Sequence, residues 1–247
     1  MTSRVKASQF HHCITVDKDQ RVFFVGDIHG CYDTLKEGLK QINFDSSKDV
    51  LISTGDWADR GKDCYGVFSF LKNTPNVFQV MGNHDQFCTG RNYSHHLSQG
   101  GKWFYFDTDQ EGKKEIRDYL SSVPYCITVH IGDRKIAVTH AEINPYFKTY
   151  SEFIEHLDID HLVRESAIWD RQAIAYEDTP PVIGVDWTVH GHTFTEDPYI
   201  VGNRLYIDTG CVFSDKDEKN YLTFAEYKHS TNGLNFYKIK NCEKYDE

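Results

Sequence analysis

Residues 21–30 read RVFFVGDIHG, a short β-branched and aromatic run that stops at Gly26-Asp27. Such a run predicts a buried strand that leads directly into a loop. The same pattern recurs in VLISTGD at residues 50–56 and in VFQVMGNH at residues 77–84. Each strand is expected to place small polar side chains at its carboxyl end. The adjacent glycines fit this expectation, because such sharp turns often need the positive φ that Gly tolerates.

Helices are expected between these strands. Within residues 32–42, Leu35, Leu39 and Ile42 recur at helical spacing, and residues 63–72 also indicate a helix. Strand, polar loop and helix therefore alternate through the first 90 residues. This alternation predicts an α/β fold whose strands are joined by helical crossovers.

The later part of the chain predicts more strands. A hairpin is expected from residues 125–129 and 135–138, turning near Gly132-Asp133 and leading to His140, and residues 150–176 predict helices in pieces. Further strands are expected at 187–189, 204–207, 221–227 and 234–239, and residues 243–247 are expected to fray. Because no repeat or linker interrupts the chain, we expect a single domain over residues 1–247.

Composition excludes several classes of protein. With 39% hydrophobic and 14% aromatic residues, the chain can bury a globular core. A net charge of −10 argues against a large basic face and hence against nucleic-acid binding. We expect no membrane association, because the sequence has no run of 18 apolar residues and no apolar signal segment at its start. The seven cysteines are widely spaced without CxxC, which favours reduced thiols in a cytoplasm.

Polar residues at the predicted strand ends form one candidate site, because loops at the carboxyl ends of strands in α/β sheets converge. The candidate metal ligands offer oxygen or imidazole nitrogen, and they are Asp27, His29, Asp56, Asn83, His140 and His192. Such donors suit manganese, iron or zinc. Six donors are too many for one catalytic ion with an open position, and they suit two divalent ions bridged by one carboxylate.

Four of the 13 histidines are assigned to this site: His29, His84, His140 and His192. The other nine, including the pairs His11-His12 and His95-His96, are expected to be structural or on the surface. Residues 103–105 (WFY) are expected in the core, with a groove lining as the alternative.

The motif series GDIHG, GDWADRG, GNHD, VTHA and HGHT resembles that of calcineurin-like metallophosphoesterases, and more narrowly the PPP family of serine/threonine protein phosphatases. GDIHGCY, QGGKWF, IWDRQ and YIDTGCVF look most like the bacteriophage lambda type of this family. The resemblance extends over roughly residues 9–227. It implies a metallophosphoesterase β-sandwich flanked by helices in αββα layers, with two metals held by loops at one edge.

The resemblance also implies a role for each candidate residue. Asp27 and His29 would hold the first metal, Asp56 would bridge, and the second metal would bind Asn83, His140 and His192. Asp59 and His84 match the catalytic pair of the family. Arg60, Arg171 and Asn83 match its phosphate-binding residues. Read without the family, Arg60 fits a salt bridge to Asp59 or Asp63, and Arg171 fits a surface cation stacked on an aromatic ring.

Four positions depart from the relatives. Met81 and Asp85 stand where the RGNHE version of the motif has Arg and Glu, so the contact of the shorter Asp85 is expected to move. His190 replaces a usually apolar residue of the phage enzymes and is expected to lie in the pocket or beside a ligand. Phe194 stands where broader phosphodiesterase relatives often carry a further His, and this favours the PPP-like branch.

The expected chemistry is direct attack by a metal-bridging hydroxide on a phosphate monoester, with Mn²⁺ as the expected ion and Fe or Zn as alternatives. Arg60 and Arg171 would bind the equatorial oxygens. His84 would protonate the leaving group while Asp59 holds its imidazole. No phosphoenzyme is required.

The expected function is a phosphatase acting on phosphorylated serine or threonine in protein and peptide substrates. Alternatives are a hydrolase of dinucleoside polyphosphates or other nucleotides, an RNA-end phosphatase, and a non-catalytic interaction module on the same fold. Rim loops 88–124 and 142–182 would decide the substrate. No regulatory-subunit tail is visible, so the chain is expected to act alone, in the cytoplasm (of the host cell if phage-encoded).

Overall fold

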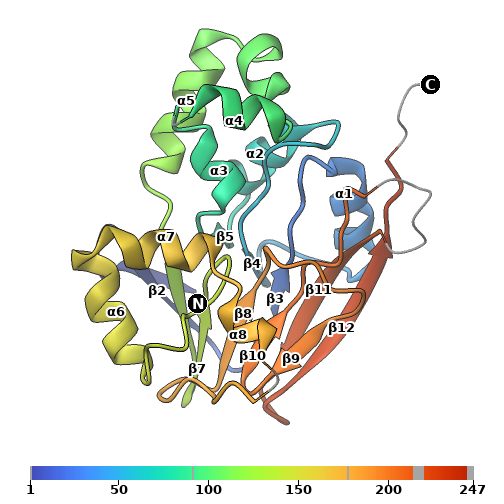
Figure 1. The fold of residues 1–247 in the computed structure, drawn as a ribbon. Coiled ribbons are helices and arrows are strands. Elements are labelled where there is room, and N and C mark those ends of the chain that lie inside the picture. The colour runs from blue at the N-terminus through green and yellow to red at the C-terminus, as the bar shows by residue number, and fades with distance from the viewer. Residues whose placement is uncertain (1, 91, 177, 214–219, 244–247) are drawn as a thin grey trace.

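Two β-sheets pack face to face, and helices cover the outer side of each sheet (Figure 1). The computed structural model describes residues 2–90, 92–176, 178–213 and 220–243. This arrangement confirms the predicted helix-flanked β-sandwich with αββα layers.

The five-stranded sheet carries the first three predicted strands. Its order is β12-β11-β3-β4-β5, in which β3 (Val22–Val25), β4 (Val50–Ser53) and β5 (Val77–Gln79) are parallel. The antiparallel strands β11 (Tyr221–Lys228) and β12 (Gly233–Lys240) extend it at one edge. Helices α1 (Tyr32–Gln41) and α2 (Cys64–Asn73) follow β3 and β4 as the predicted crossovers.

The seven-stranded sheet has the order β1-β2-β6-β7-β8-β10-β9. Its strands are β1 (Ser3–Lys6), β2 (His11–Val16), β6 (Cys126–Ile131), β7 (Arg134–Val138), β8 (Trp187–His190), β9 (Tyr199–Val201) and β10 (Arg204–Tyr206). Strands β7, β8 and β10 run parallel, so their carboxyl ends also lie at one edge. Helices α6 (Tyr150–Ile159) and α7 (His161–Trp169) lie on the outer side (Figure 1).

The core follows the alternation of side chains along each strand. Phe24 and Ile52 point between the sheets, whereas Phe23 and Leu51 pack under the helices on the outer face. All four residues of β3 are buried. A strand that is buried on both faces reads as a continuous apolar run, which is why RVFFV was recognisable.

All nine predicted strands are present, with shifts at their ends. Strand β5 ends at Gln79 because the main-chain N–H of Met81 donates to Pro124 at 2.8 Å instead of continuing the ladder with β4. Strands β1, β2 and β9 were not predicted. The polar start of β2, HHC, and the three-residue length of β9 provide little periodicity. Most of the segment expected to fray lies outside the described residues, and Glu243 accepts the N–H of Thr34 at 2.9 Å.

The region after β5 holds α3 (Asn83–Phe87), α4 (Tyr93–Ser98), a π-helical turn (Trp103–Asp107) and α5 (Gln110–Leu120). Helix α3 begins shortly after the carboxyl end of β5, and this region lies beyond that edge of the sheet (Figure 1). A short helix, α8 (Gln172–Ala175), follows α7. No helix of the described residues is long and apolar enough to cross a bilayer.

Candidate active site

The loops that follow the parallel strands of both sheets surround one pocket of about 180 Å³. Eight residues assigned to the site from the sequence line it: Asp27, His29, Asp56, Arg60, Asn83, His84, Arg171 and His192. The other two, Asp59 and His140, are fully buried and contact this set from behind. The tertiary structure therefore brings together all ten predicted residues.

The backbone at the site adopts an uncommon conformation. Nine described residues other than glycine have positive φ; four are asparagines, which tolerate it, and the rest are His29, Asp56, Asp59, Arg60 and His192. Each non-asparagine costs on the order of 1–3 kcal/mol, and such strain clusters at functional sites. The protein thus concentrates its strained backbone where the candidate ligands lie.

Two glycines beside the ligands serve different purposes. Gly55 has the positive φ, 97°, expected of a sharp turn after β4. Gly82 has φ of −96°, and its role is close approach. A Cβ at Gly82 would lie 2.2 Å from Oδ1 of Asp56, so only glycine admits that carboxylate.

Main-chain carbonyls orient three candidate imidazoles. Nδ1 of His29 donates to Ala58 at 2.7 Å, Nδ1 of His140 donates to Thr54 at 2.8 Å, and Nε2 of His192 donates to Trp169 at 3.1 Å. In each ring the other nitrogen faces the site. This is the hydrogen-bond pattern that prepares histidines for metal binding.

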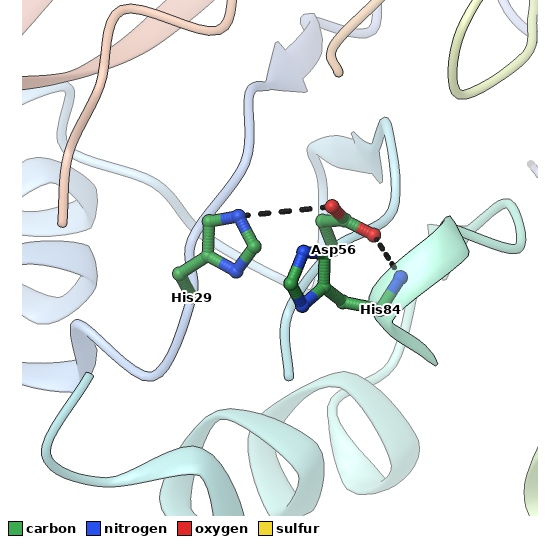
Figure 2. Close-up of side chains that lie close together, drawn as sticks. All are labelled: His29, Asp56 and His84. Atoms are coloured by element: carbon green, nitrogen blue, oxygen red, sulfur yellow. Dashed lines mark hydrogen bonds and ion pairs between the residues drawn. The ribbon is translucent and has the colours of Figure 1, made fainter. Parts of the chain in front are cut away.

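The Asp56 carboxylate lies between two groups of imidazoles. Its Oδ2 is 3.6 Å from Nε2 of His29 and 3.4 Å from Nε2 of His140, while Oδ1 accepts the main-chain N–H of His84 at 2.9 Å. Figure 2 shows His29 on one side of Asp56 and the start of α3 on the other. Because Asp56 belongs to two candidate metal-binding clusters, it has the position of a bridging ligand.

The second cluster converges on the Oδ1 atom of Asn83. This atom lies 2.8 Å from Nε2 of His140 and 2.9 Å from Nδ1 of His192. An amide oxygen and two ring nitrogens at such distances fit a divalent cation of the borderline class. The residues present therefore fit the metals expected from the sequence.

The charges of the site also favour a cation. Burial disfavours protonation of His140, but the charges of Asp56 and Asp27 overcome it and raise the pKa of His140 to about 10. Burial lowers the pKa of His29 and of His192 to about 3 each. The carboxylates thus favour a proton on His140, whereas burial keeps His29 and His192 neutral, in the form that binds metal.

The pair of Asp59 and His84 is formed as predicted. Nδ1 of His84 is 2.8 Å from Oδ2 of Asp59, which leaves Nε2 facing the pocket. Asp59 also contacts His96, a residue expected to be structural or on the surface, and Trp103, which was expected in the core.

The two arginines reach the pocket from opposite sheets. The described contacts of Arg60 are with imidazoles rather than with Asp59 or Asp63: its guanidinium donates to Nε2 of His29 at 2.9 Å and to Nε2 of His84 at 2.8 Å. Arg171 is exposed but lines the same pocket, just before α8.

The departures from the family pattern have structural explanations. Met81 is buried in the core under the helices of the five-stranded sheet. His190 is buried, with its nitrogens 3.0 Å from Thr139 Oγ1 and 2.7 Å from Thr188 Oγ1, and it belongs to none of the candidate metal clusters of the described residues. Phe194 packs against Phe213, with ring centroids 4.8 Å apart.

Four further residues line the pocket: Asp208, His95, Gln99 and Trp169. Asp208 lies two residues after the end of β10, so the strand-end rule that identified Asp56 also applies to it. Burial and the neighbouring Asp56 raise the pKa of Asp208. His95 lies in α4 and Gln99 follows its last residue, and the sequence of this helix carries no signal that places it at the pocket.

Comparisons with known proteins agree with this geometry. The sequence profile of calcineurin-like phosphoesterases matches residues 20–222. The chain belongs to the calcineurin-like phosphoesterase family. Metallophosphoesterases of this family are hydrolases that act on phosphate esters with divalent metals, and the candidate metal clusters described above match that chemistry.

Relatives of this metallophosphoesterase include two kinds of phosphatase. It is 32% identical over 207 residues to serine/threonine-protein phosphatase 2 of Salmonella typhimurium, covering 80% of this chain and 90% of the relative. It is 29% identical over 220 residues to the asymmetrical bis(5'-nucleosyl)-tetraphosphatase PrpE of Bacillus velezensis, covering 78% of this chain and 85% of that relative. A serine/threonine phosphatase structure from Saccharomyces cerevisiae shares the fold, with a TM-score of 0.67, 13% identity and coverage of 94% and 84%.

Proposed function

We propose that this metallophosphoesterase is a manganese-dependent protein phosphatase that hydrolyses phosphoserine and phosphothreonine. The observation that carries the proposal is the position of Asp56, shared between two imidazole clusters and joined to the main chain of His84. One carboxylate thereby connects a two-metal site to the candidate general acid. A matching relative is named for serine/threonine phosphatase activity over 90% of its length.

The proposed metal ligands divide between the two sheets. Asp27, His29 and the bridging Asp56 would hold one ion, and Asp56, Asn83, His140 and His192 the other. Bound divalent ions would lower the pKa of water and neutralise the charge of a phosphate.

The remaining site residues would act on the substrate. Arg60 and Arg171 would bind equatorial phosphate oxygens, because planar guanidinium groups match their geometry. His84 would donate a proton from Nε2 to the leaving alkoxide while Asp59 holds Nδ1, once the guanidinium of Arg60 has moved from Nε2 to the phosphate. The attacking oxygen would come from water, so no protein nucleophile and no phosphoenzyme are required.

The size of the pocket favours a small ester over a nucleotide. Pockets that enclose a drug-sized ligand usually measure about 300–1,000 Å³. The volume here is about 180 Å³, enough for a phosphate and its first ester atoms. A phosphorylated side chain would place little else in the pocket, whereas most of a nucleotide would lie outside it. Nucleotide hydrolysis remains the second candidate because PrpE matches most of the chain.

The direct test is an assay of metal-free protein reconstituted with Mn²⁺ on three substrates in parallel: a phosphoserine peptide, diadenosine tetraphosphate and p-nitrophenyl phosphate. We expect phosphate release from the peptide, abolished by a chelator. Turnover of the dinucleotide without the peptide would assign the protein to the nucleotide branch. Silence on all three with metals bound would support a non-catalytic module.

A further inference from the structure

Asp59 contacts three side-chain donors. Oδ2 faces Nδ1 of His84 at 2.8 Å, and Oδ1 faces Nε2 of His96 at 2.9 Å and Nε1 of Trp103 at 2.8 Å. Asp59 and His96 are both 0% exposed. A buried carboxylate with one imidazole on each oxygen has no freedom to rotate without losing a hydrogen bond.

The orientation of His96 is defined by its other nitrogen. Nδ1 of His96 lies 3.2 Å from the hydroxyl of Tyr105, which can donate to it. With Tyr105 as donor, the hydrogen of the neutral ring is on Nε2 and points at Asp59. A continuous chain therefore runs from Tyr105 through His96 and Asp59 to His84.

The surroundings of His96 are shaped for its ring. Phe87 and Phe104 lie beside it, with centroids 5.5 and 5.8 Å away and interplanar angles of 33° and 37°. A Cβ at Gly101 would lie 2.2 Å from Cδ2 and 2.4 Å from Nε2 of His96. Only glycine at position 101 leaves room for the imidazole, so the residues around His96 are complementary in shape to its ring.

We propose that His96 is a positioning residue for proton donation by His84, acting through Asp59. This inference rests on the proposed function. By holding Oδ1, His96 and Trp103 set the plane of the carboxylate. The carboxylate in turn sets the direction of the His84 ring and of its Nε2 toward the leaving oxygen. General-acid catalysis depends on such alignment.

The charge on Asp59 is consistent with this role. Burial alone would raise the pKa of Asp59, but the hydrogen bonds from His84 and His96 outweigh burial and lower it. An ionised Asp59 accepts from both rings at once, as the geometry requires.

The test exploits the different needs of two esters. Phenyl phosphate has a poor leaving group and depends on the acid, whereas p-nitrophenyl phosphate has an activated one and depends on it less. In His96→Phe, the ring and its packing are kept but the donor is lost. We expect kcat to fall about 10- to 100-fold on phenyl phosphate and less than about threefold on p-nitrophenyl phosphate, with KM changed less than about twofold on either.

A conservative variant and a double mutant sharpen the test. His96→Gln places an amide N–H near the position of Nε2 and should restore most of the rate on phenyl phosphate. In a His84→Asn background, His96→Phe should cause no further loss, because both changes remove the same proton donation. If the bulk of Phe prevents folding, His96→Leu replaces it in the same comparisons.

His11 supplies the matched control. It is also buried and hydrogen-bonded, 2.6 Å from Thr128 Oγ1, but it lies on β2 of the seven-stranded sheet, outside the pocket. His11→Phe should lower Tm without changing the ratio of the rates on the two esters.

Two results would show that His96 serves packing alone. One is an equal fall of kcat on both esters in His96→Phe, and the other is a full additional fall of kcat when His96→Phe is added to His84→Asn. A wild-type protein with bound Mn²⁺ that hydrolyses neither ester would instead overturn the proposed function, so the two failures are distinguishable.

Discussion

The carboxylate of Asp85 accepts the main-chain N–H of Asp56 at 3.0 Å. The same carboxylate accepts the N–H groups of Trp57, Ala58 and Gly82 at 3.1, 3.3 and 3.0 Å. It therefore joins the loop after β4 to the start of α3, and these two segments supply Asp56 and Asn83. The shorter stem of Asp, where the family motif has Glu, reaches all four groups from the first turn of α3.

Replacing Asp85 should weaken metal binding although Asp85 is not itself a proposed metal ligand. In Asp85→Asn, one oxygen becomes an NH₂ donor that opposes main-chain donors, and each buried N–H left unpaired costs about 1–3 kcal/mol. We expect Mn²⁺ affinity to fall at least about tenfold and unfolding by urea to occur at lower concentration. Titration calorimetry measures the Mn²⁺ affinity. Asp33→Asn, on the exposed surface of α1, is the control. Unchanged Mn²⁺ affinity would mean that the loops hold their positions without Asp85.

The bridging role of Asp56 predicts the loss of both ions together. Asp56→Asn removes the charge between the two clusters, so metal content should fall from about two ions per protein to below about one. The rate should fall with it. Mass spectrometry of metals after gel filtration gives the stoichiometry, with Asp45→Asn, at a half-exposed carboxylate between α1 and β4, as control. Full occupancy with a normal rate would remove Asp56 as the bridge.

Glu142 should fix the position of Arg171 through hydrogen bonds to the main chain that follows it. Its two oxygens accept the N–H groups of Gln172 and Ala173 at 2.9 and 2.8 Å, directly after Arg171. Glu142→Gln turns one acceptor into a donor and loosens this segment. We expect kcat/KM to fall about tenfold.

A double mutant separates this effect from general destabilisation. If Glu142 acts through Arg171, Glu142→Gln should cost nothing further in an Arg171→Ala background. As a control, Glu155→Gln, on the exposed side of α6, should leave kcat/KM unchanged both with Arg171 and in the Arg171→Ala background. An equal loss with and without Arg171 would show that Glu142 acts elsewhere.

His190 predicts a loss of stability in acid. Burial, aided by Arg204, lowers the pKa of His190 to about 3 from the unfolded value of 6.5. Between these values the unfolded chain binds a proton that the folded chain refuses, so the free energy of unfolding should fall as pH falls. The slope from this group approaches about 1.4 kcal/mol per pH unit.

His190→Leu removes that proton uptake. In chelator-treated protein, urea unfolding at pH 7.5 and 5.5 should show a smaller acid loss in the variant than in the wild type. Because His29 and His192 titrate in the same range, only the difference between the two proteins reports on His190. Parallel pH dependence of the two proteins would contradict the prediction.

Local sequence determined nine of the strands and most of the site. The run RVFFV followed by Gly-Asp specifies a buried strand and a turn within ten residues, and VLISTGD repeats it. Since parallel strands end at a common edge, the ligand set followed from the positions of the strand ends. Asp208 obeys the same rule and was equally predictable.

Only the tertiary structure decided which side chains support that site. His96 is 37 residues from Asp59, and the segment that carries it has no period linking it to the sheet. Three further sets of contacts likewise depend on loops that meet only in the folded protein. They are the hydrogen bond from His29 to the carbonyl of Ala58, the four main-chain N–H groups that donate to Asp85, and the two that donate to Glu142 after Arg171. A short-range pattern specifies how a segment turns, whereas the packing of separate segments specifies what each turn touches.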